Sequence, residues 1–244
     1  MSFPRLSLML LCLCALPLLP VAGTASGVNP PKAAFAVVPA QPTTNDAVLL
    51  DASPSVPGDI RIARYDWDFD GDGAVDVTSE QAQVRHFFDH SGSFQVTLRV
   101  SDNAGGAGAM TLPVDVAQAP VSARRGLEMT LEPNRVLAGG SFFVTVTIQV
   151  NEEASGLGLS EVVPAGWRTR PVDDGGGLFK RAQGEMQWLW AQSFVPGQSV
   201  SVRYEVDVPE TVLRGSYALT GTVSSFLPNR FKLPVYSLFD VEVL

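Results

Sequence analysis

The chain has 244 residues, of which 45% are hydrophobic and 17% charged, and its formal net charge is −8. An acidic chain has no excess of basic side chains to neutralise a phosphate backbone, so a nucleic-acid partner is not expected. Two histidines and two cysteines leave few ligands for a His/Cys metal centre and few groups for nucleophilic catalysis.

Residues 1–25 have the features of a secretory signal peptide. Arg5 gives a positive start, an apolar run covers residues 8–19, and small residues close the segment at 22–25. The run is shorter than the roughly 20 residues that a membrane-spanning helix needs, and two prolines interrupt it. We therefore expect cleavage, export to a bacterial cell envelope or the medium, and no membrane span in the exported chain.

Both cysteines, Cys12 and Cys14, lie within this segment. The exported chain is therefore expected to have no disulfide bond, no thiolate ligand and no cysteine nucleophile. Each folded part must then be stabilised by its own apolar packing.

Apolar and polar residues alternate with a period of two in several parts of the remaining chain. The pattern is clearest in residues 94–100, 142–150 and 200–208. Such segments form strands that bury one face and expose the other. Turn-forming Gly, Pro, Asn and Asp separate them at short intervals, and no long window has the 3.6-residue period of a helix. The expected fold class is all-β, with two consecutive immunoglobulin-like β-sandwich domains.

A boundary between these domains is expected at residues 118–126, which do not alternate and contain Pro, Gly and two adjacent Arg. The charge also changes there, from −7 for residues 27–120 to −2 for residues 121–244. We expect a first domain at 31–117, a short linker at 118–126 and a second domain at 127–244.

The sequence Tyr-Asp-Trp-Asp-Phe-Asp-Gly-Asp-Gly at 65–73 is the most distinctive motif of the chain. Further segments stand around it in a fixed order: 34–38, 47–53, 84–88 and 92–105. Together they resemble the PKD (polycystic kidney disease) family of immunoglobulin-like domains over about residues 31–117. The resemblance implies a non-catalytic extracellular module that serves as a spacer, an adhesive element or a contact to carbohydrate or protein. The family's commonest motif has Gly directly after the Phe, whereas Asp70 is interposed here and changes the loop.

Four carboxylates follow one another closely in this motif, at Asp68, Asp70, Asp72 and Asp76. Ca²⁺ prefers six to eight oxygen ligands on a flexible backbone, and the glycines of the loop let the chain curl round an ion. These four residues are therefore candidate Ca²⁺ ligands, although Ser79 stands where a twelve-residue calcium loop has a bidentate acid. In the alternative interpretation, the Asp side chains only hydrogen-bond a tight turn, as Asp often does.

Three short motifs characterise the second part of the chain. They are an acidic residue shortly before Pro-Ala-Gly-Trp at 161–167, a Pro-Gly turn at 196–197 and a Tyr-containing strand at 203–206. With these motifs, residues 127–244 loosely resemble immunoglobulin-like repeats of bacterial surface proteins.

Tryptophans in this part could form a glycan site, because flat aromatic rings stack on sugar faces. Trp167 follows the Pro-Ala-Gly turn and is expected to be exposed, which makes it the candidate ligand-binding residue. Trp188 and Trp190 share a strand face, but Leu189 and Ala191 beside them are also apolar. This pattern favours core packing in a strand that is buried on both sides.

No set of residues indicates a reaction, and no catalytic residue is predicted. The two histidines, His86 and His90, fit an aromatic strand and a turn, and the chain has no Gly-x-Ser-x-Gly motif. We expect a secreted, non-enzymatic protein for binding, adhesion or surface assembly, whose partner is an extracellular protein or a polysaccharide. One alternative is a carbohydrate-binding accessory protein of a secreted hydrolase system. Another is a small hydrolase with its site between the two domains.

Overall fold

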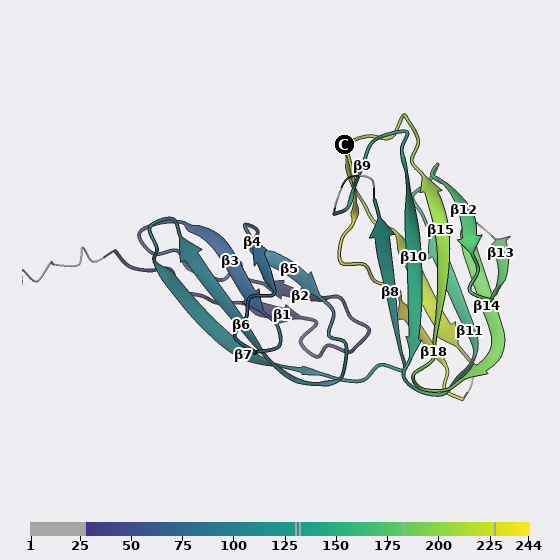
Figure 1. Cartoon of the computed structure of the whole chain (residues 1–244), viewed down its shortest axis with the longest axis horizontal. Coiled ribbons are helices and arrows are strands. Elements are labelled where there is room, and N and C mark those ends of the chain that lie inside the picture. Colours follow the sequence, from purple (N-terminus) through teal and green to yellow (C-terminus); the bar gives the residue numbers. More distant parts are fainter. Residues whose placement is uncertain (1–27, 130, 132, 183, 227) are drawn as a thin grey trace, which may run out of the picture.

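The computed structural model describes residues 28–129, 131, 133–182, 184–226 and 228–244. The expected signal peptide lies outside these residues. The described residues form nineteen strands and no α-helix, so they hold no helical segment that could span a membrane. The expected all-β fold class is confirmed, because the strands pack as two successive β-sandwiches (Figure 1).

The first sandwich consists of two sheets that enclose an apolar core. The smaller sheet contains, in spatial order, β1 (Ala36–Val38), β2 (Val48–Asp51) and β5 (Gln83–His86). The larger sheet contains β4 (Val77–Ser79), β3 (Ile62–Asp68), β6 (Gly92–Asp102) and β7 (Ala107–Val116). Trp67 at the centre is fully buried and packs edge-on against Phe35, with ring centroids 5.2 Å apart.

The second sandwich has one sheet of four strands and one of five. The four-stranded sheet contains β12 (Arg168–Asp173), β15 (Ser199–Asp207), β10 (Ser141–Val150) and β8 (Val121–Glu128). The five-stranded sheet contains β13 (Leu178–Ala182), β14 (Glu185–Phe194), β11 (Ala154–Val162), β17 (Thr220–Ser225) and β18 (Phe231–Pro234). A small sheet at one end contains β16 (Gly215–Tyr217), β19 (Val241–Val243) and β9 (Arg135–Val136).

The alternation read from the sequence determines which side chains form this second core. In β10 every second residue from Phe142 to Val150 is apolar and buried, while Phe143, Thr145 and Thr147 between them are only partly buried. The same pattern holds in β15, where Val202, Tyr204 and Val206 point inward. Each sheet thus contributes one apolar face, as a sandwich without cross-links requires.

A buried ion pair joins the two sheets of the second sandwich. Arg125 on β8 donates from Nε and Nη2 to the Glu161 carboxylate on β11, at 2.9 and 2.8 Å. The Tyr204 hydroxyl on β15 donates to the same carboxylate at 2.7 Å, and Arg125 also donates to the Leu219 carbonyl at 3.0 Å. All three side chains are at most 3% exposed. Each charge is therefore compensated where water cannot reach it.

The protonation of this group is fixed by its surroundings. Burial alone would lower the pKa of Arg125, but the adjacent Glu161 carboxylate outweighs this effect and the pKa is raised. Burial, together with the charge of Glu161, raises the pKa of Tyr204 well above its ordinary value. Both shifts favour the charged Arg125 and the protonated Tyr204 hydroxyl, the forms that donate to Glu161.

The connection between the sandwiches is shorter than expected. A linker was expected over 118–126, but residues 121–126 belong to β8 and pair with β10. Two adjacent arginines suggest a polar loop, and the sequence does not reveal that Arg125 faces inward and pairs with Glu161. Only residues 117–120 connect the last strand of the first sandwich to β8.

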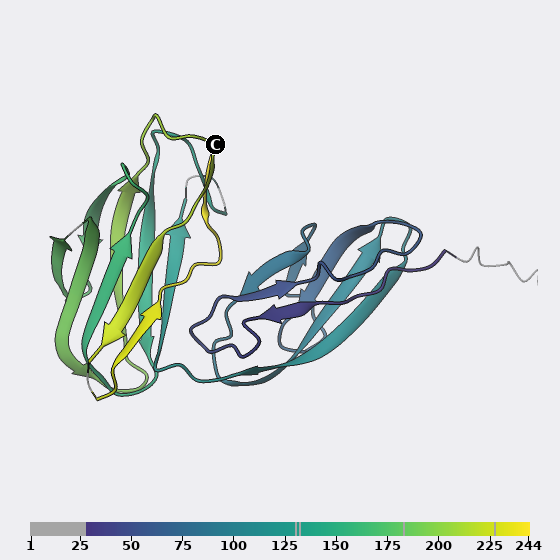
Figure 2. The same cartoon turned by 180° about the vertical axis from the view of Figure 1, so that it is seen from behind.

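Polar contacts fix the joint between the sandwiches. Asn45, which is 2% exposed, donates from Nδ2 to the Pro234 carbonyl at 3.1 Å and accepts from the Ala123 amide at 2.8 Å. Arg124 reaches back to the first sandwich, where it pairs with Asp89 at 2.5 Å. The long axes of the two sandwiches are steeply inclined to each other at this joint in both views (Figures 1 and 2).

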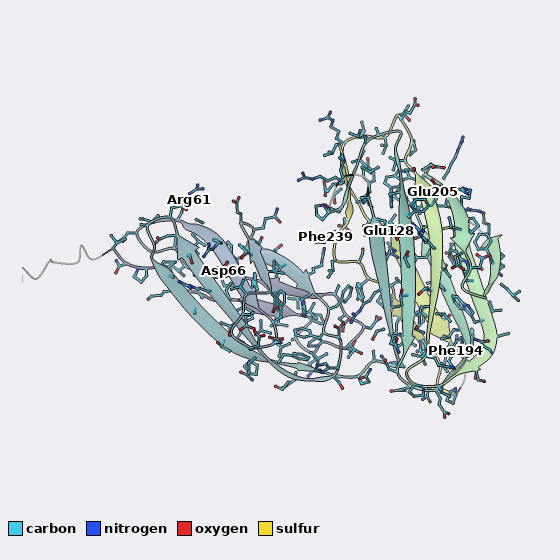
Figure 3. The ribbon with its side chains drawn as sticks, viewed as in Figure 1. Arg61, Asp66, Glu128, Phe194, Glu205 and Phe239 are labelled. Carbon is cyan, nitrogen blue, oxygen red and sulfur yellow. The ribbon has the colours of Figure 1, made fainter. Side chains whose placement is uncertain are left out.

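Glu161→Gln tests the buried ion pair. The substitution leaves the Arg125 charge uncompensated in the core, so we expect the free energy of unfolding to fall by about 3–5 kcal/mol. Glu128→Gln is the matched control, because Glu128, labelled in Figure 3, pairs with Arg203 on the exposed surface. Loss of this pair should cost less than about 1 kcal/mol. Chemical denaturation measures the free energy of unfolding of both variants. Equal losses of stability would contradict the view that Arg125 depends on Glu161 for compensation of its buried charge.

His86 predicts a pH dependence for the first sandwich. Its ring stacks on Phe69 with centroids 4.0 Å apart, and burial lowers its pKa despite nearby carboxylates such as Asp76. Below the ordinary value of about 6.5, the unfolded chain binds a proton that the folded chain does not, so stability falls as the pH falls from about 7. Denaturant titrations between pH 7.5 and 5.5 should show a shallower decline in His86→Phe than in the wild type. His90→Phe, the same change at an exposed position, should leave the slope unchanged.

Candidate functional site

Carboxylates gather in the loop between β3 and β4 of the first sandwich. Ligand oxygens of Asp68, Asp70 and Asp76 lie within 4.8 Å of one another. Asp68 is buried, whereas the other two are exposed. The structure thus brings together three of the four predicted Ca²⁺ ligands. Asp72 is not part of this group. Its carboxylate accepts a hydrogen bond from the Ala74 amide at 2.7 Å.

The same carboxylates also hold the loop together. Asp68 accepts from the amides of Gly71 and Gly73 at 2.7 and 3.0 Å, and Asp76 accepts from the Phe69 amide at 2.7 Å. Both glycines have a positive φ, which a tight turn of this kind requires. The turn thus uses both oxygens of Asp68 and one oxygen each of Asp70 and Asp76. A carboxylate oxygen has two lone pairs, so an oxygen that accepts one hydrogen bond can still contact a cation.

Trp167 does not lie where the sequence placed it. Its ring is 7% exposed and packs against Phe142 and Tyr217, with centroids 6.2 and 5.3 Å away. The expected exposure is wrong, because the turn closed by the Trp167 amide and the Pro164 carbonyl directs the ring back into the core. A ring in this position has no free face for a sugar.

Trp188 and Trp190 pack in the core, as the sequence favoured, but their strand is buried on one side only. Both rings are at most 3% exposed, whereas Leu189 between them is 45% exposed. The loop between β12 and β13 satisfies both indole groups: Trp188 donates to Asp174 at 2.8 Å and Trp190 to the Gly175 carbonyl at 2.9 Å. The outer face of β14 is therefore free for other contacts.

A groove with a volume of about 850 Å³ lies on this outer face, which belongs to the five-stranded sheet. The sheet forms the front of the second sandwich in Figure 2. Strand register places two rows of neighbours across it. One row is Leu178, Leu189, Gly158, Ser224 and Lys232, and the next is Lys180, Gln187, Ser160, Thr222 and Pro234.

Side-chain size explains the hollow. The residues over β11 and β17 are small, with Gly158, Ser160 and Ser224 on the floor. Leu178, 70% exposed, stands on one side, and Phe226, 61% exposed, stands on the other. The inward-facing neighbours of the same strands are large and buried, so the core is complete without the outer face.

Hydrogen-bonding groups line the floor of the groove. The Glu185 carboxylate accepts from the Ser160 hydroxyl and, at 3.1 Å, from the Gln187 amide. The hydrogen bond from Ser160 lowers the pKa of Glu185, and the charge of Lys232 acts in the same direction. The groove thus offers hydroxyl, amide and carboxylate groups beside exposed apolar side chains.

The sequence analysis did not find this groove. The only signal was that outward positions of neighbouring strands carry small or hydroxyl residues, such as Gly158, Ser160 and Thr222. Their relation depends on which strands are neighbours and in which register. Residues 158 and 232, for example, fall in one row only through two strand pairings, β11 with β17 and β17 with β18.

Solved structures similar in fold include a carbohydrate-binding module of the β-sandwich superfamily, with 19% identity over 88% of this chain and 99% of that chain and a TM-score of 0.35. The major pilin subunit of Bacillus cereus has 8% identity, coverages of 88% and 69% and a TM-score of 0.41. A non-cellulosomal cohesin from Archaeoglobus fulgidus has 14% identity, coverages of 52% and 92% and a TM-score of 0.35. TM-scores below 0.5 give no basis for transferring a function.

No curated protein matches the sequence. The model of the PKD domain family matches residues 28–117, which confirms the resemblance expected for about residues 31–117. The match ends before the second sandwich, so the resemblance of residues 127–244 to bacterial surface repeats stays a prediction. Residues 28–117 of this chain form a PKD domain.

Proposed function

We propose that this is an exported, non-catalytic binding protein that holds an extended polysaccharide chain in the groove of its second sandwich. The PKD domain acts as the spacer that carries this sandwich. Export is supported by the sequence of residues 1–25, and the binding role by the hollow on the outer face of the five-stranded sheet. A protein that holds a polymer of the cell surface would also serve adhesion.

The groove supports a polymer ligand by its shape and its lining. Its lining residues come from all five strands of the sheet, from Leu178 on β13 to Lys232 on β18, so it offers contacts over a longer span than a compact molecule would use. Ser160 and Gln187 each donate one hydrogen to Glu185, which leaves the Ser160 oxygen, the Gln187 carbonyl and its second N–H, and the Thr222 hydroxyl for a ligand. Sugar units expose hydroxyl groups and apolar C–H faces side by side, and this floor offers partners for both.

The histidines support a non-catalytic role. His86 packs between Phe69 and Phe88, and His90 lies on Phe94, with centroids 4.0, 4.7 and 4.9 Å away. A cavity of about 440 Å³ lies between the sandwiches, where a hydrolase site was an alternative, and neither histidine lines it. Of its charged lining residues, Arg125 is already bound to Glu161.

Thr222→Phe tests the groove. The residue lies at the centre of the floor, and a Phe there keeps strand propensity while it fills the hollow. We expect the affinity for insoluble polysaccharides, measured by retention, to fall at least tenfold, which corresponds to a loss of about 1.4 kcal/mol in binding free energy. Thr145→Phe, on the outer face of β10 in the opposite sheet, is the matched control and should bind like the wild type. No retention of the wild type on any polysaccharide would reject the proposal.

Cation binding by the acidic loop is a second proposal. It is favoured by the convergence of Asp68, Asp70 and Asp76 within 4.8 Å. Three carboxylates at this separation repel one another, and a cation would remove the repulsion. Ca²⁺ suits these oxygen ligands, and its role would be to stiffen the loop rather than to take part in a reaction.

Calorimetry of the chain with Ca²⁺ tests the loop. We expect binding with a dissociation constant of roughly 0.1–1 mM, the range of extracellular modules. Asp70→Asn removes one charge from the cluster and should weaken binding at least tenfold. Asp115→Asn, an exposed acid on β7, should have no effect. Absence of heat at millimolar Ca²⁺ would leave only the turn interpretation.

A further inference from the structure

The groove carries positive charge on a protein that is acidic overall. Three cationic side chains line it, Lys180, Arg230 and Lys232, against the single carboxylate of Glu185. The whole chain, in contrast, has a formal charge of −8. The cations therefore form a local excess, and a groove of this sign attracts an anionic ligand.

None of these three cations forms an ion pair within the part of the chain that the structure describes. The other arginines of this sandwich that lie near acids are paired, as Arg170 is with Glu205 and Arg203 with Glu128. The three groove cations are exposed, and the Arg230 guanidinium lies 5.7 Å from the Phe226 ring centroid.

The cations stand on both walls of the groove. Lys180 is on β13 and Lys232 on β18, the two edge strands of the five-stranded sheet. Strand spacing puts these edges roughly 15–20 Å apart. A single sulfate or a monosaccharide cannot contact both walls, so a ligand that uses both sets of charges has to be an oligomer with repeated anionic groups.

The backbone of the floor argues against an acidic peptide. Peptides that bind sheets as extra strands pair with free backbone groups at an edge. Here β11 pairs with β14 on one side and with β17 on the other, so the floor has no free strand edge. A peptide could add as a strand only at the outer edges of β13 and β18, away from the floor. Hydroxyl and amide groups such as Ser160, Thr222 and Gln187 fit a ligand that carries hydroxyls along its whole length.

We infer that the groove binds an anionic polysaccharide, a chain whose sugar units carry carboxylate or sulfate groups. This inference rests on the proposed function and adds the sign of the ligand's charge. Lys180, Lys232 and Arg230 contact the anionic groups, while Ser160, Thr222 and Gln187 on the floor contact the sugar hydroxyls.

Four polymers distinguish the contribution of the ligand's charge from that of its sugar units. Dextran sulfate and dextran share a backbone and differ in charge, and polygalacturonate supplies carboxylates in place of sulfates. Polyglutamate supplies carboxylates without sugar. We expect the exported chain to bind dextran sulfate or polygalacturonate, to bind dextran and polyglutamate at least tenfold more weakly, and to lose affinity as salt is raised.

Charge variants identify the residues. Lys180→Gln combined with Lys232→Gln should weaken binding of the anionic polysaccharide about tenfold, because each exposed charge contributes modestly. Arg168→Gln combined with Arg214→Gln removes the same charge from exposed positions outside the groove lining and should change affinity less than twofold.

The outcomes separate this inference from the proposed function. Equal binding of neutral and anionic polysaccharides, abolished by Thr222→Phe, would overturn the charge inference and leave the groove as a glycan site. Equal or tighter binding of polyglutamate would overturn the assignment to a polysaccharide. If both double variants weaken binding equally, the net charge of the protein and not the groove accounts for the effect, and the inference is overturned. If the chain binds no polymer, both proposals are rejected.

Discussion

Strand β11 has to serve two faces of the second sandwich at once. Leu157, Leu159 and Glu161 point into the core, while Gly158 and Ser160 between them form the floor of the groove. A shift of one residue would expose all the inward side chains and bury the outward ones. The bonds from Arg125 and Tyr204 to Glu161 oppose such a shift, because it would leave a buried arginine without its partner.

The buried ion pair is thus more informative about register than about stability. Removing one member of such a pair is costly, whereas replacing the whole pair with apolar residues often is not. Arg125 and Glu161 come from opposite sheets, so they also fix how the two sheets face each other. Gly221 adds to this constraint, because a Cβ there would lie 1.9 Å from a Glu161 oxygen.

The sequence predicted correctly those features that neighbouring residues determine, such as a strand and its buried face. Alternation in 142–150 gave a strand with the correct buried face, and the motif at 65–73 led to the PKD domain. Features that depend on a distant partner were misread or missed. Arg125 appeared to belong to a linker because Glu161 is 36 residues away, and the exposure expected for Trp167 ignored the direction of its turn. The groove depends on the register of five strands and had no motif of its own.

The joint between the sandwiches has a mechanical consequence. Asn45 of the PKD domain bonds to the Pro234 carbonyl, and Pro234 ends the strand that carries Lys232. Tension along the chain would pass mainly through residues 117–120 into β8, and the Asn45 side chain is a second, non-covalent route that leads to one wall of the groove. If the groove holds a polymer as proposed, the polymer and a pull on the PKD domain would both act on β18.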